Sequence, residues 1–213
     1  MTIEIYQFPL GMTMTNAYLV ANPETGNAVV IDPGYDGEEI LEEAKKLGVE
    51  IEAIWLTHAH FDHIGGAGAV ASGLTPEPPV ALHPEDMWLW EMQGGAPLFG
   101  LTGVDAGPRP TILLEHGMIL SLGEVQFEVF HAPGHTPGHV MFYCKEAAAL
   151  FCGDVIFQSS IGRTDLPRGS YAVLLQSIRE HVLTLPDETR LLNGHGPETT
   201  VGRERVYNPF INM

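Results

Sequence analysis

A run of metal-ligand side chains at the end of an apolar segment is the feature that most constrains this chain. From Thr57 to His63 the sequence is Thr-His-Ala-His-Phe-Asp-His, which places three imidazoles and a carboxylate within six consecutive positions. Neutral imidazole nitrogen and carboxylate oxygen are ligands that zinc, iron and manganese accept. A single histidine rarely ligates a metal, but four ligand-type side chains in one internal cluster predict a metal site.

The surroundings of the cluster predict how its ligands are presented. An apolar stretch ends at Leu56 and two glycines follow the cluster, so a short buried strand is expected to deliver the ligands into a loop. On such a loop His58 and His60 share one side. Asp62 and His63 occupy adjacent positions, so their side chains cannot both point to the side that His58 and His60 share. This indicates a second metal position close by.

Length and composition predict one domain over residues 1–213. The chain is 45% hydrophobic, which is enough for a sizeable core. No apolar run approaches the roughly 20 residues that cross a bilayer, and the start Met1-Thr2-Ile3-Glu4 lacks the order of a secretion signal. Cys144 and Cys152 give no disulfide framework and are expected to be buried free thiols. We therefore expect a cytoplasmic protein.

The charge balance limits the partners. The chain has 27 acidic and 10 basic residues, a formal net charge of -17, which opposes a phosphate backbone and an anionic membrane. We expect neither nucleic acid nor a membrane as a partner. Cations bound inside the protein would reverse the field locally, so a small anionic substrate is still admissible at the site itself. The sequence leaves the oligomeric state open, and a homo-oligomer is compatible with it.

Apolar periodicity and breaker residues predict two β-rich segments, each followed by a helix. Strands are expected at 3–8, 16–21, 28–32, 51–56, 118–120, 125–131, 139–143 and 149–152. Helices are expected at 36–47, 66–71, 84–93 and 171–183. The stretch 94–110 is rich in glycine and proline and is predicted to be a long loop, of the kind that often borders an active site.

Three further ligand-type side chains each follow an apolar strand and lie beside glycine. They are His135 in Pro-Gly-His-Thr-Pro-Gly-His, Asp154 after Phe-Cys-Gly, and His195 in Asn-Gly-His-Gly. The strand fixes the direction of each ligand, and the glycine removes a side chain where loops crowd around an ion. The recurrence of strand, glycine and ligand is the second strong signal in the chain.

The ligand-type residues, taken in order, resemble those of the metallo-β-lactamase superfamily. They are His58, His60, Asp62, His63, His135, Asp154 and His195. The Gly-His-Thr-Pro-Gly-His stretch, the Gly-Arg-Thr-Asp-Leu-Pro stretch at 162–167 and Asn208-Pro209-Phe210 are similar to short glyoxalase II-type (hydroxyacylglutathione hydrolase-like) hydrolases of bacteria. The resemblance covers nearly the whole chain. It implies an α+β fold, the αββα sandwich, with two mixed β-sheets flanked by helices and a metal pair at one edge.

The resemblance also implies the ligand set. His58, His60 and His135 would hold the first ion; Asp62, His63 and His195 would hold the second; and Asp154 would bridge them. Two ions roughly 3.5 to 4 Å apart can share a water, lower its pKa and present hydroxide to a carbonyl that one ion polarises. In the family picture Asp62 also orients that hydroxide, so Asp62 and Asp154 are the expected catalytic carboxylates. The expected cofactors are two divalent ions, zinc in the first place, with iron and manganese as the other candidates.

The substrate implied by the resemblance is an acyl thioester such as S-lactoylglutathione. Arg163 and Arg168 are near Asp154 in sequence and are candidates for contacting a substrate carboxylate, with solvated loop arginines as an equal alternative. Many glyoxalase II enzymes hold glutathione with a helical C-terminal extension, for which this chain ends too early. The expected enzyme is therefore a dinuclear thioester hydrolase of glyoxalase II type, with a substrate that is not fixed by the sequence.

Alternatives from other reaction classes stay open. A persulfide dioxygenase has the same fold but uses one iron, for which His58, His135 and Asp154 could supply two histidines and a carboxylate. A lactonase and a non-catalytic metal-binding module are less favoured, the latter because no ligand is missing. The absence of a signal sequence argues against a secreted β-lactamase, and the acidic charge argues against a nuclease.

The remaining candidate residues are expected in supporting roles. Asp32 and Thr57 are predicted to hydrogen-bond near the site. His139 begins a strand and is expected to be a structural hydrogen-bonding residue. The histidines expected to be ordinary are His83, His116, His131 and His181.

Overall fold

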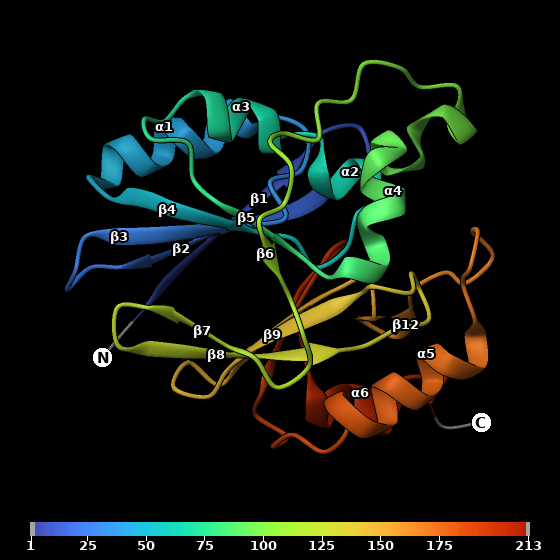
Figure 1. Ribbon diagram of the computed structural model, residues 1–213. Coiled ribbons are helices and arrows are strands. Elements are labelled where there is room, and N and C mark those ends of the chain that lie inside the picture. The colour runs from blue at the N-terminus through green and yellow to red at the C-terminus, as the bar shows by residue number, and fades with distance from the viewer. Residues whose placement is uncertain (1–2, 212–213) are drawn as a thin grey trace.

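Two six-stranded β-sheets lie face to face in the computed structural model, which describes residues 3–211 (Figure 1). The first sheet consists of β1 (Glu4–Leu10), β2 (Thr15–Asn22), β3 (Asn27–Ile31), β4 (Glu50–Trp55), β5 (Val80–Leu82) and β6 (Ile112–Leu113). These strands lie side by side in sequence order. The pairs β1–β2 and β2–β3 are antiparallel, and β3 to β6 run parallel.

The second sheet is formed by the C-terminal half of the chain. It consists of β7 (Ile119–Leu122), β8 (Val125–His131), β9 (Val140–Cys144), β10 (Ala149–Gly153), β13 (Arg190–Asn193) and β14 (Thr199–Thr200). Their order across the sheet is β14-β13-β10-β9-β8-β7, and only β10 and β13 pair in parallel. A separate two-stranded ribbon pairs β11 (Ile156–Phe157) with β12 (Ser160–Ile161).

Helices cover the outer faces of the two sheets. Before the second sheet come α1 (Gly37–Leu47), α2 (Phe61–Ile64), α3 (Ala67–Ser72), the 3₁₀ turn η1 (Pro84–Asp86), α4 (Met87–Glu91) and the 3₁₀ segment η2 (Gln93–Phe99). Later come α5 (Tyr171–Ser177), the π-helical turn η3 (Ile178–Val182) and α6 (Val201–Tyr207). In Figure 1, α1 and α3 lie above the first sheet, and α5 and α6 lie below the second. No helix in residues 3–211 is long and apolar enough to cross a bilayer.

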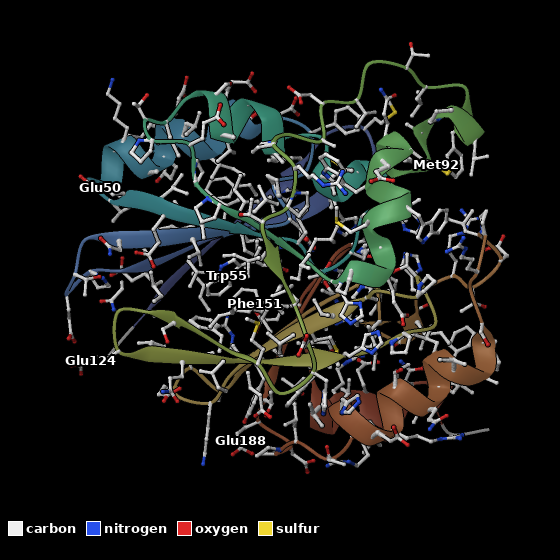
Figure 2. The ribbon with its side chains drawn as sticks, viewed as in Figure 1. Glu50, Trp55, Met92, Glu124, Phe151 and Glu188 are labelled. Atoms are coloured by element: carbon white, nitrogen blue, oxygen red, sulfur yellow. The ribbon has the colours of Figure 1, made fainter. Side chains whose placement is uncertain are left out.

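The alternation of side chains along the strands explains the layers. In β3, Ala28 and Val30 pack toward the helices, whereas Val29 and Ile31 pack into the space between the sheets. Aromatic rings from both sheets fill that space, with Trp55 5.1 Å from Phe127 between ring centroids. The αββα sandwich implied by the resemblance is therefore confirmed, and Figure 2 shows Trp55 between the layers.

The predicted elements are present, with bounds shifted by one or two residues for most of them. The predicted helix at 84–93 is broken into η1 and α4, and the predicted loop at 94–110 begins with the helical turns of η2. The late helix continues beyond Ser177 only as a π-helical turn. Short strands that the sequence analysis did not predict are β5, β6, β11, β12 and β14. Both cysteines are buried free thiols, as predicted.

One edge of the sandwich gathers the ends of strands from both sheets. The strand β4 ends just before His58, β10 ends just before Asp154, and β13 ends just before His195. Because β10 and β13 are parallel, their carboxyl ends point to the same edge. A hydrogen bond from the Asn16 amide to the Gly194 carbonyl, at 2.7 Å, joins the first sheet to the loop that carries His195.

Candidate metal centre

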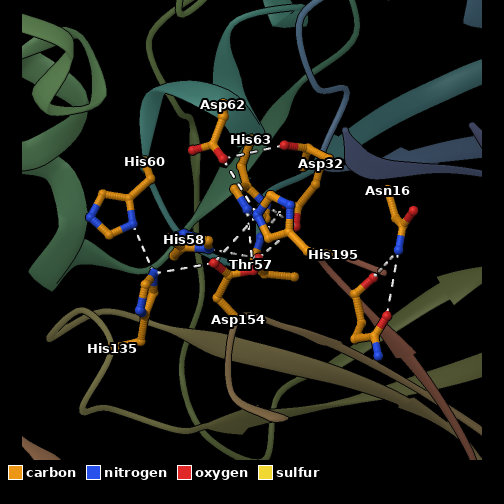
Figure 3. A network of polar contacts seen from close by, with 12 residues as sticks. Asn16, Asp32, Thr57, His58, His60, Asp62, His63, His135, Asp154 and His195 are labelled. Atoms are coloured by element: carbon orange, nitrogen blue, oxygen red, sulfur yellow. Dashed lines mark hydrogen bonds and ion pairs between the residues drawn. The ribbon is translucent and has the colours of Figure 1, made fainter. Parts of the chain in front are cut away.

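All the predicted ligand residues converge at this edge (Figure 3). The loop after β4 and the helix α2 carry His58, His60, Asp62 and His63; the turn between β8 and β9 carries His135; and the ends of β10 and β13 carry Asp154 and His195. The helix α2 begins at Phe61 and carries Asp62 and His63 in its first turn, with the ring centroids of His63 and His58 4.1 Å apart. Asp62 and His63 join His195 in a second set of donors, as expected from their adjacent positions.

One group of donors consists of His58, His60 and His135, whose donor atoms lie within 4.8 Å of one another. The Nδ1 atom of His60 is 2.9 Å from Nε2 of His135, so a proton or a cation is needed between the two lone pairs. Burial, reinforced by the neighbouring imidazoles, lowers the pKa of His58 and of His60, and burial also lowers that of His135. All three rings are therefore neutral near pH 7, which is the form that ligates metals.

A second group consists of Asp62, His63 and His195, again with donor atoms within 4.8 Å. The Nε2 atom of His195 is 3.4 Å from Oδ2 of Asp62. Burial acts to raise the pKa of Asp62, but His195 and His63 outweigh it and lower that pKa. Burial acts to lower the pKa of His195, but the hydrogen bond with Asp62 and the charge of Asp154 raise it. In the second group the ionised Asp62 attracts positive charge, which protons on the histidines supply in the protein alone and which a metal ion would supply in their place.

Asp154 lies between the two groups. Its Oδ1 is 3.4 Å from Nε2 of His63, and its Oδ2 is 3.5 Å from Nε2 of His135 and 3.6 Å from Nε2 of His195. Burial opposes ionisation of Asp154, but these histidines, His63 first, hold its pKa far below the ordinary value. An ionised carboxylate in this position can contact an ion in either group.

Most of the histidines are held by a hydrogen bond at the ring nitrogen that faces away from the centre. These bonds join Nδ1 of His58 to Thr57 Oγ1 (3.0 Å), of His63 to Asp32 Oδ2 (2.9 Å), of His135 to the Arg163 carbonyl (2.7 Å) and of His195 to the Thr13 carbonyl (3.2 Å). Such partners fix the orientation of a ring and increase the basicity of its other nitrogen. In each of the four, Nε2 is left for a ligand.

Buried polar atoms without partners show that the centre fits a cation. Among residues 3–211, Nε2 of His58, Nε2 of His63 and Oδ1 of Asp154 are buried and accept or donate no hydrogen bond. Burying such atoms without a partner is costly, and coordination to a metal satisfies them. Gly194 keeps this space open, because a Cβ there would overlap Asp154 Oδ1 and would lie 2.7 Å from the His63 ring. The residues present therefore fit a pair of metal ions.

Asp32 and Thr57 occupy the supporting positions predicted for them. The Asp32 carboxylate accepts hydrogen bonds from the Thr57 amide (2.8 Å) and hydroxyl (2.6 Å), and it contacts His63 Nδ1 at 2.9 Å. His139 also has the structural role predicted for it. Its Nε2 accepts a hydrogen bond from the Asp154 amide at 3.0 Å, and its ring stacks on His58 with centroids 4.7 Å apart.

The sequence analysis missed Asp86, which joins the two ligand loops of the first group. Its fully buried carboxylate accepts hydrogen bonds from the Ala59 amide (3.1 Å), the Thr136 hydroxyl (2.7 Å) and the Gly138 amide (2.7 Å). Ala59 separates His58 from His60, and Thr136 follows His135. No sequence signal distinguishes Asp86 from the exposed acid before it, because its role depends on where the chain folds.

The two arginines proposed for a substrate carboxylate are both engaged. Arg163 donates two hydrogen bonds to Asp165, at 2.7 and 2.8 Å, and this pairing raises the pKa of the guanidinium. The guanidinium of Arg168 lies over the Trp88 ring, 4.2 Å from its centroid. Only Arg163 lines the cleft above the ligands.

The histidines expected to be ordinary lie apart from the centre but close to one another. His83 and His131 stack with ring centroids 4.1 Å apart and planes 11° apart, and His116 and His181 lie 5.0 Å apart. Donor atoms of His83, Glu85 and His131 are close enough to surround an ion. However, parallel stacked rings direct their lone pairs side by side, so an ion cannot lie in both ring planes.

The chain is similar to members of one protein family both in sequence and in structure. The family model described as the metallo-beta-lactamase superfamily matches residues 10–195. The chain is 39% identical to hydroxyacylglutathione hydrolase GloC of Haemophilus influenzae, over 100% of this chain and 99% of that protein. Among solved structures it is similar to the BLEG-1 B3 metallo-beta-lactamase, with 42% identity, a TM-score of 0.91 and coverage of 99% of this chain and 100% of that one.

Two further structures bear on the metal centre. TTHA1623 in a di-iron-bound form is 43% identical, with a TM-score of 0.87 and coverage of 96% of this chain and 99% of that one. ETHE1 from Myxococcus xanthus is 25% identical, with a TM-score of 0.79 and coverage of 97% and 83%. The family match, the shared fold and the clustered histidines and aspartates lead to one conclusion: this chain belongs to the metallo-β-lactamase superfamily and is a metal-dependent hydrolase.

Proposed function

We propose that the protein hydrolyses an acyl thioester, such as S-lactoylglutathione, with two divalent metal ions. One observation carries the proposal: two complete donor groups lie side by side, and Asp154 contacts histidines of both. His58, His60 and His135 would hold one ion, Asp62, His63 and His195 the other, and Asp154 would contact both. The name of the relative from Haemophilus influenzae, hydroxyacylglutathione hydrolase, supports a thioester as the substrate.

When bound, the ions would lower the pKa of a water held between them and polarise the carbonyl of the thioester. The residues of the chain position that water and its proton. Asp62 accepts a hydrogen bond from the Thr15 hydroxyl at 3.2 Å through Oδ2, the oxygen that also faces His195. Its carboxylate also lines the cleft, where it can accept a proton from the attacking water.

The reaction adds the water oxygen to the carbonyl carbon and breaks the carbon–sulfur bond. The thiol leaves with one proton of the water, and the acid keeps the other oxygen-bound proton or releases it. Asp154 and Asp62 are the carboxylates that we expect to be indispensable, because each contacts a histidine donor directly. Zinc suits the donor set, and iron suits it as well, as in the di-iron form of the neighbour TTHA1623.

A second candidate is a mononuclear iron dioxygenase that acts on a persulfide. His58, His135 and Asp154 offer two imidazoles and a carboxylate, and His58 Nε2 and Asp154 Oδ1 are among the buried atoms of residues 3–211 that have no hydrogen-bond partner. The similarity to ETHE1 keeps this candidate in view. A mononuclear dioxygenase would leave the second group of donors without a role, whereas the proposed hydrolase uses all seven ligand residues.

The deciding experiment measures two reactions on one preparation. Protein loaded with zinc or with iron is assayed for thiol release from S-lactoylglutathione and for oxygen uptake with glutathione persulfide, and its metal content is determined by elemental analysis. We expect thiol release and two metal equivalents. One iron per chain together with persulfide-dependent oxygen uptake would replace the hydrolase with the dioxygenase.

Variants complete the design. His58→Ala and Asp154→Ala should abolish thiol release while the circular dichroism spectrum stays close to that of the parent. His181→Ala is the matched control, because it removes a half-buried histidine that lies outside the metal centre. Retained turnover in either of the first two variants would contradict the roles proposed for these residues.

A further inference from the structure

The cleft above the metal ligands has aromatic walls. It has a volume of about 530 Å³ and is lined by Phe61 and Phe99 on one side, with the two ring centroids 5.4 Å apart. Phe157 of β11 lines it next to His195, with ring centroids 6.0 Å apart. A group attached to a carbonyl at the metal centre therefore meets aromatic carbon near both donor groups.

Apolar lining continues away from the ligands. Ile161 and Leu166 also line the cleft, and the lining residues that are neither apolar nor ligands are Thr13, Ser160 and Arg163. Phe99 and Leu166 are shared with a smaller adjoining depression. Its other apolar lining residues are Trp88, Leu89, Leu98 and Pro167.

Large apolar side chains are exposed near the cleft. The exposed fraction is 76% for Met12 and 59% for Met14, on either side of the lining residue Thr13, and 58% for Leu98 and 47% for the lining residue Phe99. Because Thr13 and Phe99 line the cleft, these exposed side chains place apolar surface at its rim. They extend the apolar character of the cleft beyond the metal ligands.

Positive charge is scarce in the same place. Apart from the histidine ligands, Arg163 is the one basic side chain among the described residues that line the cleft, and both hydrogen bonds of its guanidinium, at 2.7 and 2.8 Å, go to Asp165. Asp165 occupies Nε and Nη2 of this guanidinium, so a substrate carboxylate would have to share the positive charge with Asp165 or displace it. Glutathione has two carboxylates, so a site that recognises both of them through charged side chains would need more arginine or lysine than this cleft offers.

We infer that the substrate is a thioester with a bulky apolar acyl group, and that the carboxylates of its thiol half are not recognised. The inference deepens the proposed function and rests on it, because it names the class of thioester that the same cleft takes. The aromatic walls and Ile161 would bury the acyl group. The paired Arg163 would leave the thiol half with little contribution to selectivity.

The experiment compares four thioesters on the metal-loaded protein. Phenylacetyl and lactoyl groups are each joined to glutathione and to N-acetylcysteamine, which has no carboxylate. We expect kcat/KM to be at least about tenfold higher for phenylacetyl than for lactoyl with either thiol. We expect glutathione and N-acetylcysteamine esters of one acyl group to agree within about threefold, because one paired arginine cannot discriminate strongly.

Variants test the residues named. Phe157→Ala should lower the ratio of phenylacetyl to lactoyl turnover by about tenfold, whereas Phe210→Ala, a phenylalanine that does not line the cleft, should leave the ratio unchanged. Arg163→Gln should leave the ratio of glutathione to N-acetylcysteamine esters unchanged. A selective loss on the glutathione esters would show that Arg163 binds a substrate carboxylate and would overturn the inference.

The outcomes separate the inference from the proposed function. Hydrolysis of S-lactoylglutathione without a preference for the phenylacetyl ester would overturn the inference alone. If none of the four thioesters is hydrolysed, the proposed function is overturned. In that case binding is measured by calorimetry with ketone analogues, in which a methylene replaces the thioester sulfur. Tighter binding of the phenylacetyl analogue than of the lactoyl analogue would still support the apolar specificity of the cleft, and equal binding would reject it.

Discussion

Replacing Asp86 with alanine tests whether one buried carboxylate holds the first donor group together. The side chain accepts three hydrogen bonds through two oxygens, with Oδ2 serving Ala59 and Thr136 and Oδ1 serving Gly138. The side chain is completely buried, and burial acts to raise the pKa of Asp86 against these hydrogen bonds. Asp86→Ala therefore removes the acceptor of three donors at once.

The magnitude follows from the cost of an orphaned donor. Each buried donor left without a partner costs about 1–3 kcal/mol. Three donors at the lower value give a loss of about 3 kcal/mol, because water can enter the space and partly replace the carboxylate. For a chain of this length, a loss of 1 kcal/mol lowers the melting temperature by about 2–4 °C, so we expect a decrease of about 6–12 °C.

The assay is thermal unfolding of the chelated protein followed by circular dichroism. Glu85→Ala is the matched control, because it removes the neighbouring exposed acid and should change stability by no more than about 0.5 kcal/mol. Asp86→Asn should fall between the two, because its amide group would face one of the backbone donors. If Asp86→Ala melts within about 2 °C of Glu85→Ala, the reasoning from orphaned donors is refuted.

A competition assay with a chelator extends the same test to the metal centre. Asp86 joins the backbone on both sides of the first donor group, so its loss should loosen His58, His60 and His135 relative to one another. Removing a supporting partner of this kind typically lowers metal affinity about 10–100-fold. Unchanged affinity of both equivalents in Asp86→Ala would show that these ligands are positioned by other contacts.

Three further predictions concern the metal, a glycine and pH. Chelation should lower the melting temperature of the parent protein, and adding zinc should restore it, because the ions bind only the folded state. Gly194→Ala should reduce bound metal measured by elemental analysis, because its Cβ would overlap Asp154; two retained equivalents would contradict this. Burial and the neighbouring His131 lower the pKa of His83 from 6.5 to about 4. Between pH 6.5 and about pH 4 the unfolded chain therefore binds more protons than the folded chain. The free energy of unfolding decreases as the pH falls through this range. In guanidinium melts of chelated protein, His83→Gln should lose less stability than the parent between about pH 7 and pH 4.5; an equal loss would reject the assignment.

The candidate centre was predictable because its residues are clustered or stand in a repeated context. Four ligand-type residues lie within six positions, and His135, Asp154 and His195 each follow an apolar strand beside glycine. The predicted strands were also found: some alternate, because one face is buried, and others such as β2 and β10 are continuous apolar runs, because both faces are buried. These signals are local in the chain.

The contacts that were missed depend on tertiary placement. Asp86 looks like any acid at a helix start, and only its position against Ala59 and Gly138 makes it a buried acceptor. Strands of two or three residues such as β6 and β12 are too short to show a period and are defined by backbone pairing with their neighbours. The pairing of Arg163 with Asp165 is local, two residues apart, but which neighbour a flexible guanidinium selects depends on the surrounding fold.

Each donor group takes side chains from both halves of the chain. His58 and His60 from the N-terminal half meet His135 from the C-terminal half, and Asp62 with His63 meets His195. Neither half alone can assemble either of these sets, so the full ligand set of each ion forms only after the two halves have docked. Metal supply would then act on the last stage of folding: in a metal-poor environment newly made chains would separate more readily at the seam between their halves than within either of them.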